Sequence, residues 1–120
     1  MAAGIYNFTI EQGTTFTRTF KYKDSEGNPI DLTSNGGFTA RMDIRTKAGG
    51  DLINAFSTSG GQITITNTNF ITLTIDADTT TAMNFNTAVY DLEIIDPITS
   101  AVTRLLQGKI KLSKEVTTST

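Results

Sequence analysis

Two pairs of carboxylates are the residues of this sequence with the types and spacing for acid/base or metal chemistry. Asp76/Asp78 and Asp91/Glu93 are each spaced i,i+2, so on a β-strand both members of a pair point to one face. Such a pair could supply a general acid and a general base. Asp91/Glu93 alternates with Tyr90, Leu92 and Ile94, and we interpret it as the solvated face of a strand.

For Asp76/Asp78 the competing roles are a helix N-cap and a partial calcium site. Asp-x-Asp without further ligands is a weak calcium signal, so we favour the cap. The run 24–28 could also hold a cation, but a turn accounts for all five of its residues. We therefore predict no catalytic residue, no metal site, no cofactor and no enzymatic activity.

Composition excludes several classes of site. The chain has no Cys, His or Trp, which removes disulfides, Cys/His zinc sites and Ser-His-Asp triads. It has no glycine-rich phosphate-binding motif. Ten Lys and Arg against twelve Asp and Glu give a net charge of -2 without charged blocks, so we expect neither nucleic acid nor membrane as a partner. No export signal or apolar span is recognisable.

The elements that must position these residues are β-strands. Thr, Ile and Phe are abundant, and these residues suit a pleated, half-buried surface. Apolar side chains recur with a period of 2 rather than 3.6. This pattern predicts strands over residues 6–10, 16–22, 30–33, 38–45, 52–56, 62–66, 71–76, 88–94 and 102–112.

Turn signals separate these strands. Residues 23–29 combine Asp, Gly and Pro and predict a hairpin tip, and 34–37, 47–51, 57–61, 67–69 and 96–100 predict further turns or loops. Alternation fails after Asp76, where Asp78 as N-cap followed by 79–83 predicts the single short helix. We expect disorder at 117–120.

Short strands without βαβ spacing indicate two packed antiparallel sheets. The prediction is an all-β, immunoglobulin-like antiparallel sandwich of about seven to nine strands with one helical turn. It forms a single domain over 1–120, with flexible ends at about 1–5 and 117–120.

A succession of motifs along the chain resembles the amino-terminal domain of phage baseplate upper proteins and related small phage tail-operon proteins. Each motif alone is a generic hairpin signal, and the resemblance comes from their order over nearly the whole chain. The motifs are Glu11-Gln12-Gly13, Phe16-x-x-x-Phe20, Asp24-x-x-Gly27-Asn28-Pro29-Ile30-Asp31-Leu32-Thr33, Phe38-Thr39-Ala40-Arg41-Met42-x-Ile44-Arg45, Ile71-Thr72-Leu73-Thr74-Ile75, Ala88-Val89-Tyr90-Asp91-Leu92-Glu93, and Val102-Thr103-Arg104-Leu105-Leu106-Gln107-Gly108-Lys109-Ile110.

The resemblance implies a virion structural protein, made in the host cytoplasm, that anchors other phage structural proteins such as fibres in the tail or baseplate. It also implies several copies or a symmetric homo-oligomer. The chain lacks the helical and receptor-binding parts that follow this domain in baseplate upper proteins, which favours an adaptor or connector. The alternatives are a head decoration or neck protein, or a carbohydrate- or ligand-binding sandwich, although most aromatic residues fall on predicted core faces.

Edge strands and exposed loops are the expected interface of such an adaptor. For Leu105, which interrupts the polar face of the last strand, a contact role and a singly exposed apolar residue are equally supported. The interface candidates are Tyr6, Phe8 and Ile10 in the first strand, Asp24, Glu26, Asn28 and Pro29 at the hairpin tip, and Leu105.

Overall fold

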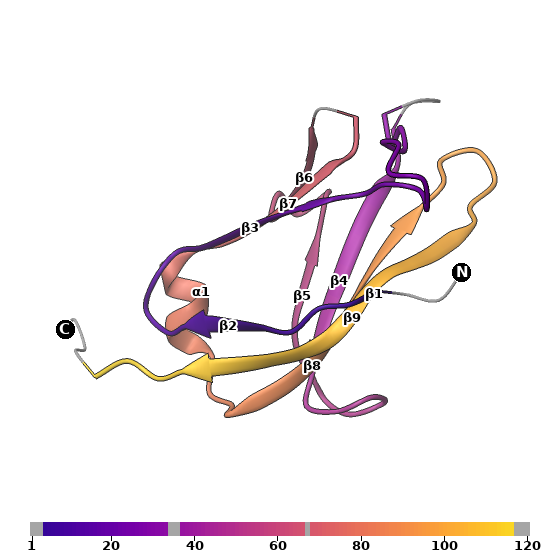
Figure 1. Ribbon diagram of the computed structural model, residues 1–120. Helices are drawn as coiled ribbons and strands as arrows, with labels where there is room; N and C mark the ends of the chain where they lie inside the picture. Colours follow the sequence, from indigo (N-terminus) through magenta and orange to yellow (C-terminus); the bar gives the residue numbers. More distant parts are fainter. Residues whose placement is uncertain (1–3, 34–36, 67, 117–120) are drawn as a thin grey trace.

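The computed structural model describes residues 4–33, 37–66 and 68–116, which form nine strands and one short helix. The predicted all-β sandwich is confirmed (Figure 1). The elements are β1 (Gly4–Ile5), β2 (Phe8–Glu11), β3 (Phe16–Lys21), β4 (Thr39–Arg45), β5 (Leu52–Ser57), β6 (Ile63–Thr66), β7 (Phe70–Ile75), α1 (Ala77–Ala82), β8 (Thr87–Ile95) and β9 (Val102–Ser113).

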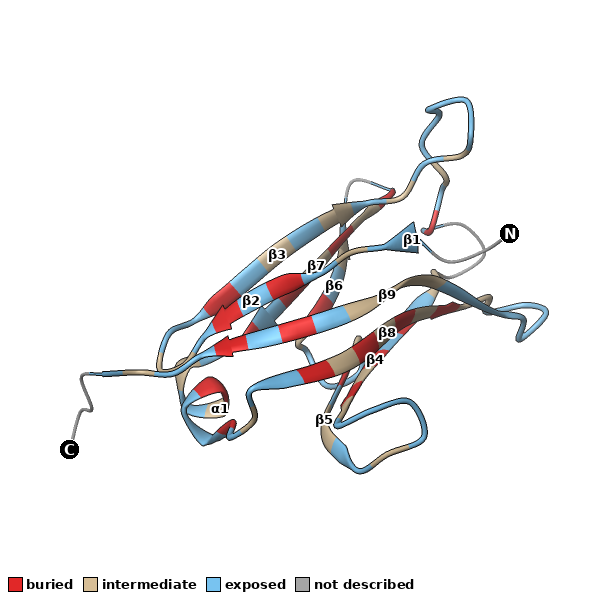
Figure 2. Cartoon of the chain, turned by 60° about the horizontal axis from the view of Figure 1, so that its bottom comes forward, coloured by how far each residue is buried: buried red, intermediate tan, exposed pale blue. Residues whose placement is uncertain are grey.

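The strands form two sheets. The large sheet has the order β1-β9-β8-β4-β5, with β2 also paired to β9, and the small sheet has the order β3-β7-β6. β1 and β2 therefore lie at one edge of the large sheet, and β3 lies at an edge of the small sheet. Figures 1 and 2 both show β2 between β3 and β9, so the two edges lie on the same side of the sandwich.

Side-chain alternation builds the core between these sheets. Figure 2 shows buried residues alternating with intermediate or exposed ones along β8, β4 and the C-terminal part of β9. On β8, for example, every second residue from Ala88 to Ile94 is buried. The largest side chains with almost no exposed surface are Ile10, Leu32, Met42, Ile44, Ile63, Ile71, Leu73, Ile75, Leu92 and Ile110. The period-2 pattern of the sequence thus predicts the inward faces correctly except in the first half of β9, where a register shift turns Arg104 outward.

The first strand is an exception to the predicted antiparallel pairing, because β1 and β2 run parallel to β9. The predicted strand over 6–10 is also divided, with Tyr6 and Asn7 between β1 and β2. At this break the Tyr6 carbonyl accepts a hydrogen bond from the Tyr90 hydroxyl at 2.6 Å. The Asn7 side-chain oxygen accepts one from the Lys109 N–H at 2.8 Å. Side chains thus replace the missing ladder contacts.

The predicted strand over 30–33 is wrong. Pro29, which has no N–H, forms only an isolated bridge with Lys23. Beyond it the backbone N–H groups of Ile30 and Leu32 donate to the carbonyls of Tyr22 and Thr68, two different segments. The tip itself is a turn as predicted, since the Asp24 carboxylate accepts from the N–H groups two and four residues ahead, and Gly27 has a φ of 84°.

The helix begins two residues earlier than expected. Its N-cap is Asp76, not Asp78, and the Asp76 carboxylate accepts from the Thr79 N–H at 2.8 Å. Hydrogen bonds from the Thr79 hydroxyl and N–H lower the pKa of the Asp76 carboxyl, because they favour its charged form. Asp78 lies in the first turn instead. Parts of the turns predicted at 34–37 and 67–69, and the tail at 117–120, lie outside the described residues.

No helix in the described part of the chain has the length and apolar character to cross a membrane. Helix α1 lies at one end of the sandwich (Figure 1). There the fully buried Thr80 hydroxyl accepts from the Gly13 N–H and donates to the Thr14 carbonyl. These two hydrogen bonds hold the helix against the loop that connects β2 to β3.

Replacing Thr80 with valine, which has the same shape, is expected to lower the free energy of unfolding by about 2 kcal/mol. The change leaves the Gly13 N–H and the Thr14 carbonyl without their partner, and each buried unsatisfied group costs about 1–3 kcal/mol. Urea unfolding followed by circular dichroism measures the change. Thr81→Val is the matched control, because the Thr81 hydroxyl bonds only within the helix and is exposed; equal losses in both variants would contradict the prediction.

Candidate functional site

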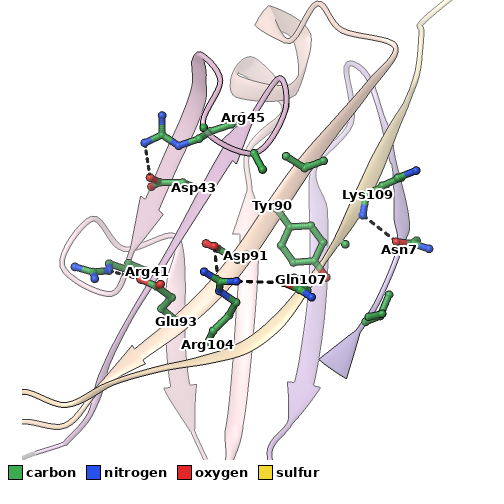
Figure 3. A pocket seen from close by; sticks show the side chains of 15 residues that line it. Asn7, Arg41, Asp43, Arg45, Tyr90, Asp91, Glu93, Arg104, Gln107 and Lys109 are labelled. Atoms are coloured by element: carbon green, nitrogen blue, oxygen red, sulfur yellow. Dashed lines mark hydrogen bonds and ion pairs between the residues drawn. The ribbon is translucent and has the colours of Figure 1, made fainter. Parts of the chain in front are cut away.

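Two surfaces of the sandwich carry residues arranged for binding. We call the outer side of β4, β8 and β9 the charged face (Figure 3). We call the gap between the edge formed by β1 and β2 and the edge formed by β3 the seam. The charged face is polar, whereas the seam is aromatic and aliphatic.

Three ion pairs cross the charged face. The distances between charged nitrogen and oxygen atoms are 2.8 Å for Arg41–Glu93, 3.1 Å for Arg45–Asp43 and 3.4 Å for Arg104–Asp91. Figure 3 shows these pairs side by side, with Arg104 also contacting Gln107. They line a depression of about 680 Å³ that is also lined by the loop at 48–49 and by Ile5 and Asn7.

Antiparallel register explains the Arg41–Glu93 pair and leaves one conflict on this face. Arg41 lies opposite Glu93, but Asp43 lies directly opposite Asp91, and like charges in that position repel. Burial raises the pKa of the Asp91 carboxyl, and the charges of Glu93 and Asp43 raise it further against the opposing effect of Arg104. All three carboxylates on this face are already paired with arginine.

The structure thus places Asp91 and Glu93 on an outer strand face, as predicted. Within the described residues no group of three or more Asp, Glu, His or Cys side chains could hold a metal ion. Asp76 and Asp78 lie apart from the charged face, at α1.

The seam is closed at one end by aromatic side chains. The rings of Phe8 and Phe16 stack at 5.2 Å between centroids, and those of Tyr6 and Phe20 meet edge to face at 5.5 Å. These pairs join the two sheets, because Phe8 and Tyr6 belong to the amino-terminal edge and Phe16 and Phe20 to β3.

Arg18 lies among these rings, at an inward position of β3 between Phe16 and Phe20. Its guanidinium carbon is 5.2 Å from the Phe16 ring centroid and 5.8 Å from that of Tyr6, distances at which a cation is attracted to a ring face. It donates a hydrogen bond to the Tyr6 hydroxyl. Arg18 is half-buried, and its surroundings in the described chain contain no carboxylate within ion-pair distance.

Beyond the Tyr6–Phe20 contact the seam opens into an apolar groove of about 450 Å³. We define this groove by its lining residues, which are Ile5, Tyr6, Thr19, Phe20, Lys21, Tyr22, Ile71, Leu92, Leu105 and Leu106. Ile5 at its rim is 76% exposed. Lys21 is its one charged lining residue, and no Asp or Glu lines it.

A β-bulge brings both leucines of β9 to the groove. Leu92 pairs with Leu106 and Glu93 pairs with Arg104, so Leu105 is the extra residue of the bulge. It is half-buried and packs against the core. Leu105 is therefore not a singly exposed apolar residue, which was one of its two predicted interpretations.

The seam also presents free backbone groups. The Tyr22 N–H bonds to the Asn69 carbonyl across the β3–β7 ladder. Because antiparallel pairs alternate between hydrogen-bonded and open positions, the backbone groups of Thr17, Thr19 and Lys21 point away from β7. All three residues are exposed. The outer edge of β3 is thus available for pairing.

Four of the predicted interface residues lie along the seam and four do not. Tyr6 and Leu105 line the groove, Phe8 closes the aromatic end, and Ile10 is wholly buried in the core behind it. Glu26, Asn28 and Pro29 are exposed in the turn beyond Tyr22, and Asp24 in the same turn is half-buried. They form a separate surface at one end of the molecule.

The sequence analysis missed Arg18, Ile5 and Phe20 as site residues. A signal for Arg18 existed, because a charged residue between two inward-facing aromatics of an alternating strand must enter the core or an edge. Nothing local marked Ile5 or Phe20, since their role depends on two edges meeting across the sandwich.

Comparison with known proteins yields no assignment. No protein-family model matches the chain, and no curated protein sequence is significantly similar to it.

Proposed function

We propose that this chain is a phage virion structural protein, an adaptor or connector of the tail or baseplate that anchors other virion proteins. In this proposal the seam is the docking surface, and its occupant is an extended segment of a partner structural protein. The protein is then an interaction module that works by strand addition.

The observation that carries the proposal is an apolar groove directly beside a free strand edge. A strand edge with unpaired N–H and C=O groups is a template for another chain, and proteins normally protect it. Here Thr17, Thr19 and Lys21 offer such groups, while Ile5 and Leu105 offer apolar contact in the adjacent groove. A partner strand gains main-chain hydrogen bonds from the edge and side-chain contacts from the groove.

The resemblance to phage tail-operon proteins supports the same role. Most of its motifs fall on strands of the sandwich, including Phe16 and Phe20 on β3 and the run from Val102 to Ile110 on β9. Both of these strands border the seam. The motifs that suggest the family thus also build the proposed docking surface.

The test is assembly of the chain into particles, with one variant in the groove. Leu105→Lys places a charge in the groove and is expected to lower incorporation into phage tails about tenfold, which requires a loss of only about 1.4 kcal/mol. Thr103→Lys is the matched control, because it adds the same charge at an exposed position of the same strand. Quantitative mass spectrometry of separated heads and tails from complemented phage measures the copy number.

Wild-type chain in the tail fraction at a multiple of three or six, the count that a tail of three- or six-fold symmetry would require, would support the adaptor. Copies on the order of hundreds in heads would overturn it in favour of decoration. Absence from particles would overturn it in favour of a ligand-binding sandwich. Equal incorporation of the two lysine variants would remove the seam as the docking surface.

A further inference from the structure

If the seam docks a strand as proposed above, the guanidinium group of Arg18 restricts which partner segments can bind there. A guanidinium group has five N–H donors. Arg18 uses one of them, on the Tyr6 hydroxyl, and the described residues give its other N–H groups no acceptor. A half-buried guanidinium group loses part of its hydration free energy. Without a carboxylate beside it, no ion pair compensates for that loss.

The surrounding rings do not replace that carboxylate. Phe16, Phe8 and Tyr6 each lie 5.2–6.0 Å from the guanidinium carbon, and ring faces attract a cation without accepting several directed hydrogen bonds. They do hold the planar group in one orientation, which suits it to grip a carboxylate through two parallel hydrogen bonds.

The charge along the seam also favours a partner segment that carries a carboxylate. The Lys21 amine lies 5.1 Å from the Phe70 ring centroid, on the outer face of the small sheet, so Arg18 is the cation that faces the seam, beside an apolar groove that no acidic residue lines. An acidic strand therefore complements it, and a basic strand is repelled.

The spacing follows from strand geometry. On β3, Arg18 and Phe20 are two residues apart and point to the same side, Arg18 among the rings and Phe20 into the groove. A strand added beside β3 also points every second side chain inward. A residue level with Arg18 is then two positions from a residue level with the groove.

We propose that the seam binds an extended partner segment in which an Asp or Glu stands two residues from a large aliphatic residue. Arg18 pairs with the carboxylate, and Ile5, Phe20 and Leu105 contact the aliphatic side chain. Arg18 determines specificity in this scheme, whereas the edge of β3 supplies the main-chain hydrogen bonds for any extended chain.

Synthetic peptides test this scheme on the full chain. The probes are capped heptapeptides Thr-Val-Thr-Glu-Thr-Leu-Thr and Thr-Leu-Thr-Glu-Thr-Val-Thr, which cover both strand directions, and their counterparts with Gln or Lys in place of Glu. NMR titration of isotope-labelled protein measures affinity and location together. We expect a Glu peptide to bind about tenfold more tightly than its Gln counterpart and the Lys peptide most weakly, with the largest amide shifts at Thr17, Thr19 and Lys21.

Two protein variants assign the preference. Arg18→Met keeps a long apolar stem in the seam and is expected to abolish the preference for Glu over Gln. Arg41→Met removes a cation from the charged face instead and is expected to leave the preference intact. If Arg18→Met does not fold, the peptide series on wild-type protein still tests the preference for Glu over Gln.

The outcomes separate the two proposals. Equal binding of Glu and Gln peptides at the edge of β3 would overturn the role of Arg18 and leave strand addition in place. A preference lost in Arg41→Met rather than Arg18→Met would also overturn it. No binding of any peptide at millimolar concentration would overturn both the carboxylate motif and strand addition at the seam.

Discussion

Replacing Gly108 with alanine is expected to destabilise the fold by about 3 kcal/mol. A Cβ at Gly108 would lie 2.2 Å from the Tyr6 carbonyl oxygen and 2.8 Å from the Asn7 side-chain oxygen. The first of these atoms is backbone, so the chain between β1 and β2 would have to move. The movement would cost the hydrogen bonds to Tyr90 and Lys109, and overpacking alone costs about 1–3 kcal/mol.

Burial raises the pKa of the Tyr90 hydroxyl well above its ordinary value, so this group stays protonated and donates to Tyr6 over the working pH range. Its bond to the Tyr6 carbonyl is one that Gly108→Ala would break. Guanidinium unfolding measures the stability, and hydrogen exchange of the Lys109 amide reports the local opening. The control is Gly4→Ala, whose Cβ would lie 3.2 Å from the end of the Leu106 side chain and at an ordinary contact distance of 3.7 Å from the Leu105 carbonyl oxygen; an expected change within about 0.5 kcal/mol fits an exposed site.

An undiminished stability of Gly108→Ala would contradict the path of the amino-terminal segment across β9. That path determines the seam, because Tyr6 reaches both Phe20 and Arg18 from this position.

Replacing Ile10 with alanine is expected to lower the free energy of unfolding by about 3–4 kcal/mol. Ile10 has no exposed surface, and deleting most of a buried isoleucine loses its transfer free energy and leaves a cavity. It sits on β2 opposite Leu112 of β9, so the loss also tests the parallel pairing. Urea unfolding at constant pH measures it.

Ile5→Ala is the matched control on the same edge. Ile5 is exposed, so the same substitution is expected to change stability by at most about 0.5 kcal/mol while weakening peptide binding at the groove. Similar stability losses in the two variants would show that β2 is not packed as described, and a stable Ile10→Ala would be the clearest contradiction.

Most strands could be predicted from the sequence because their signal is local. Alternation between Phe38 and Arg45 or between Ala88 and Ile94 shows which side chains point inward whatever the strand pairs with. The segment 30–33 was mispredicted because its apolar residues, Ile30 and Leu32, pack inward without joining a ladder. The N-cap was misplaced by two residues because two aspartates compete for one role and only the backbone decides between them.

The candidate site was only partly predictable for a different reason. The hairpin tip at 24–29 was found from turn residues alone, and Tyr6, Phe8 and Leu105 were found as edge or anomalous positions. Alternation along β3 places Arg18 on the same face as Phe16, but the other two rings around it, Tyr6 and Phe8, come from the amino-terminal edge. Contacts between Arg18 and Phe8, ten positions apart in sequence and on different sheets, have no local signal.

By itself the sequence determined the all-β class and the inward faces of the long strands up to the bulge in β9, since both follow from side-chain alternation along a single strand. Only the tertiary structure decided that β2 runs parallel to β9, that Leu105 is the extra residue of a bulge, and that two edges meet to form the seam. The physical reason is that strand pairing and register are set by hydrogen bonds and packing between segments far apart in the chain. The charged face follows the same rule, because Asp43 and Asp91 became neighbours only through the register of β4 and β8.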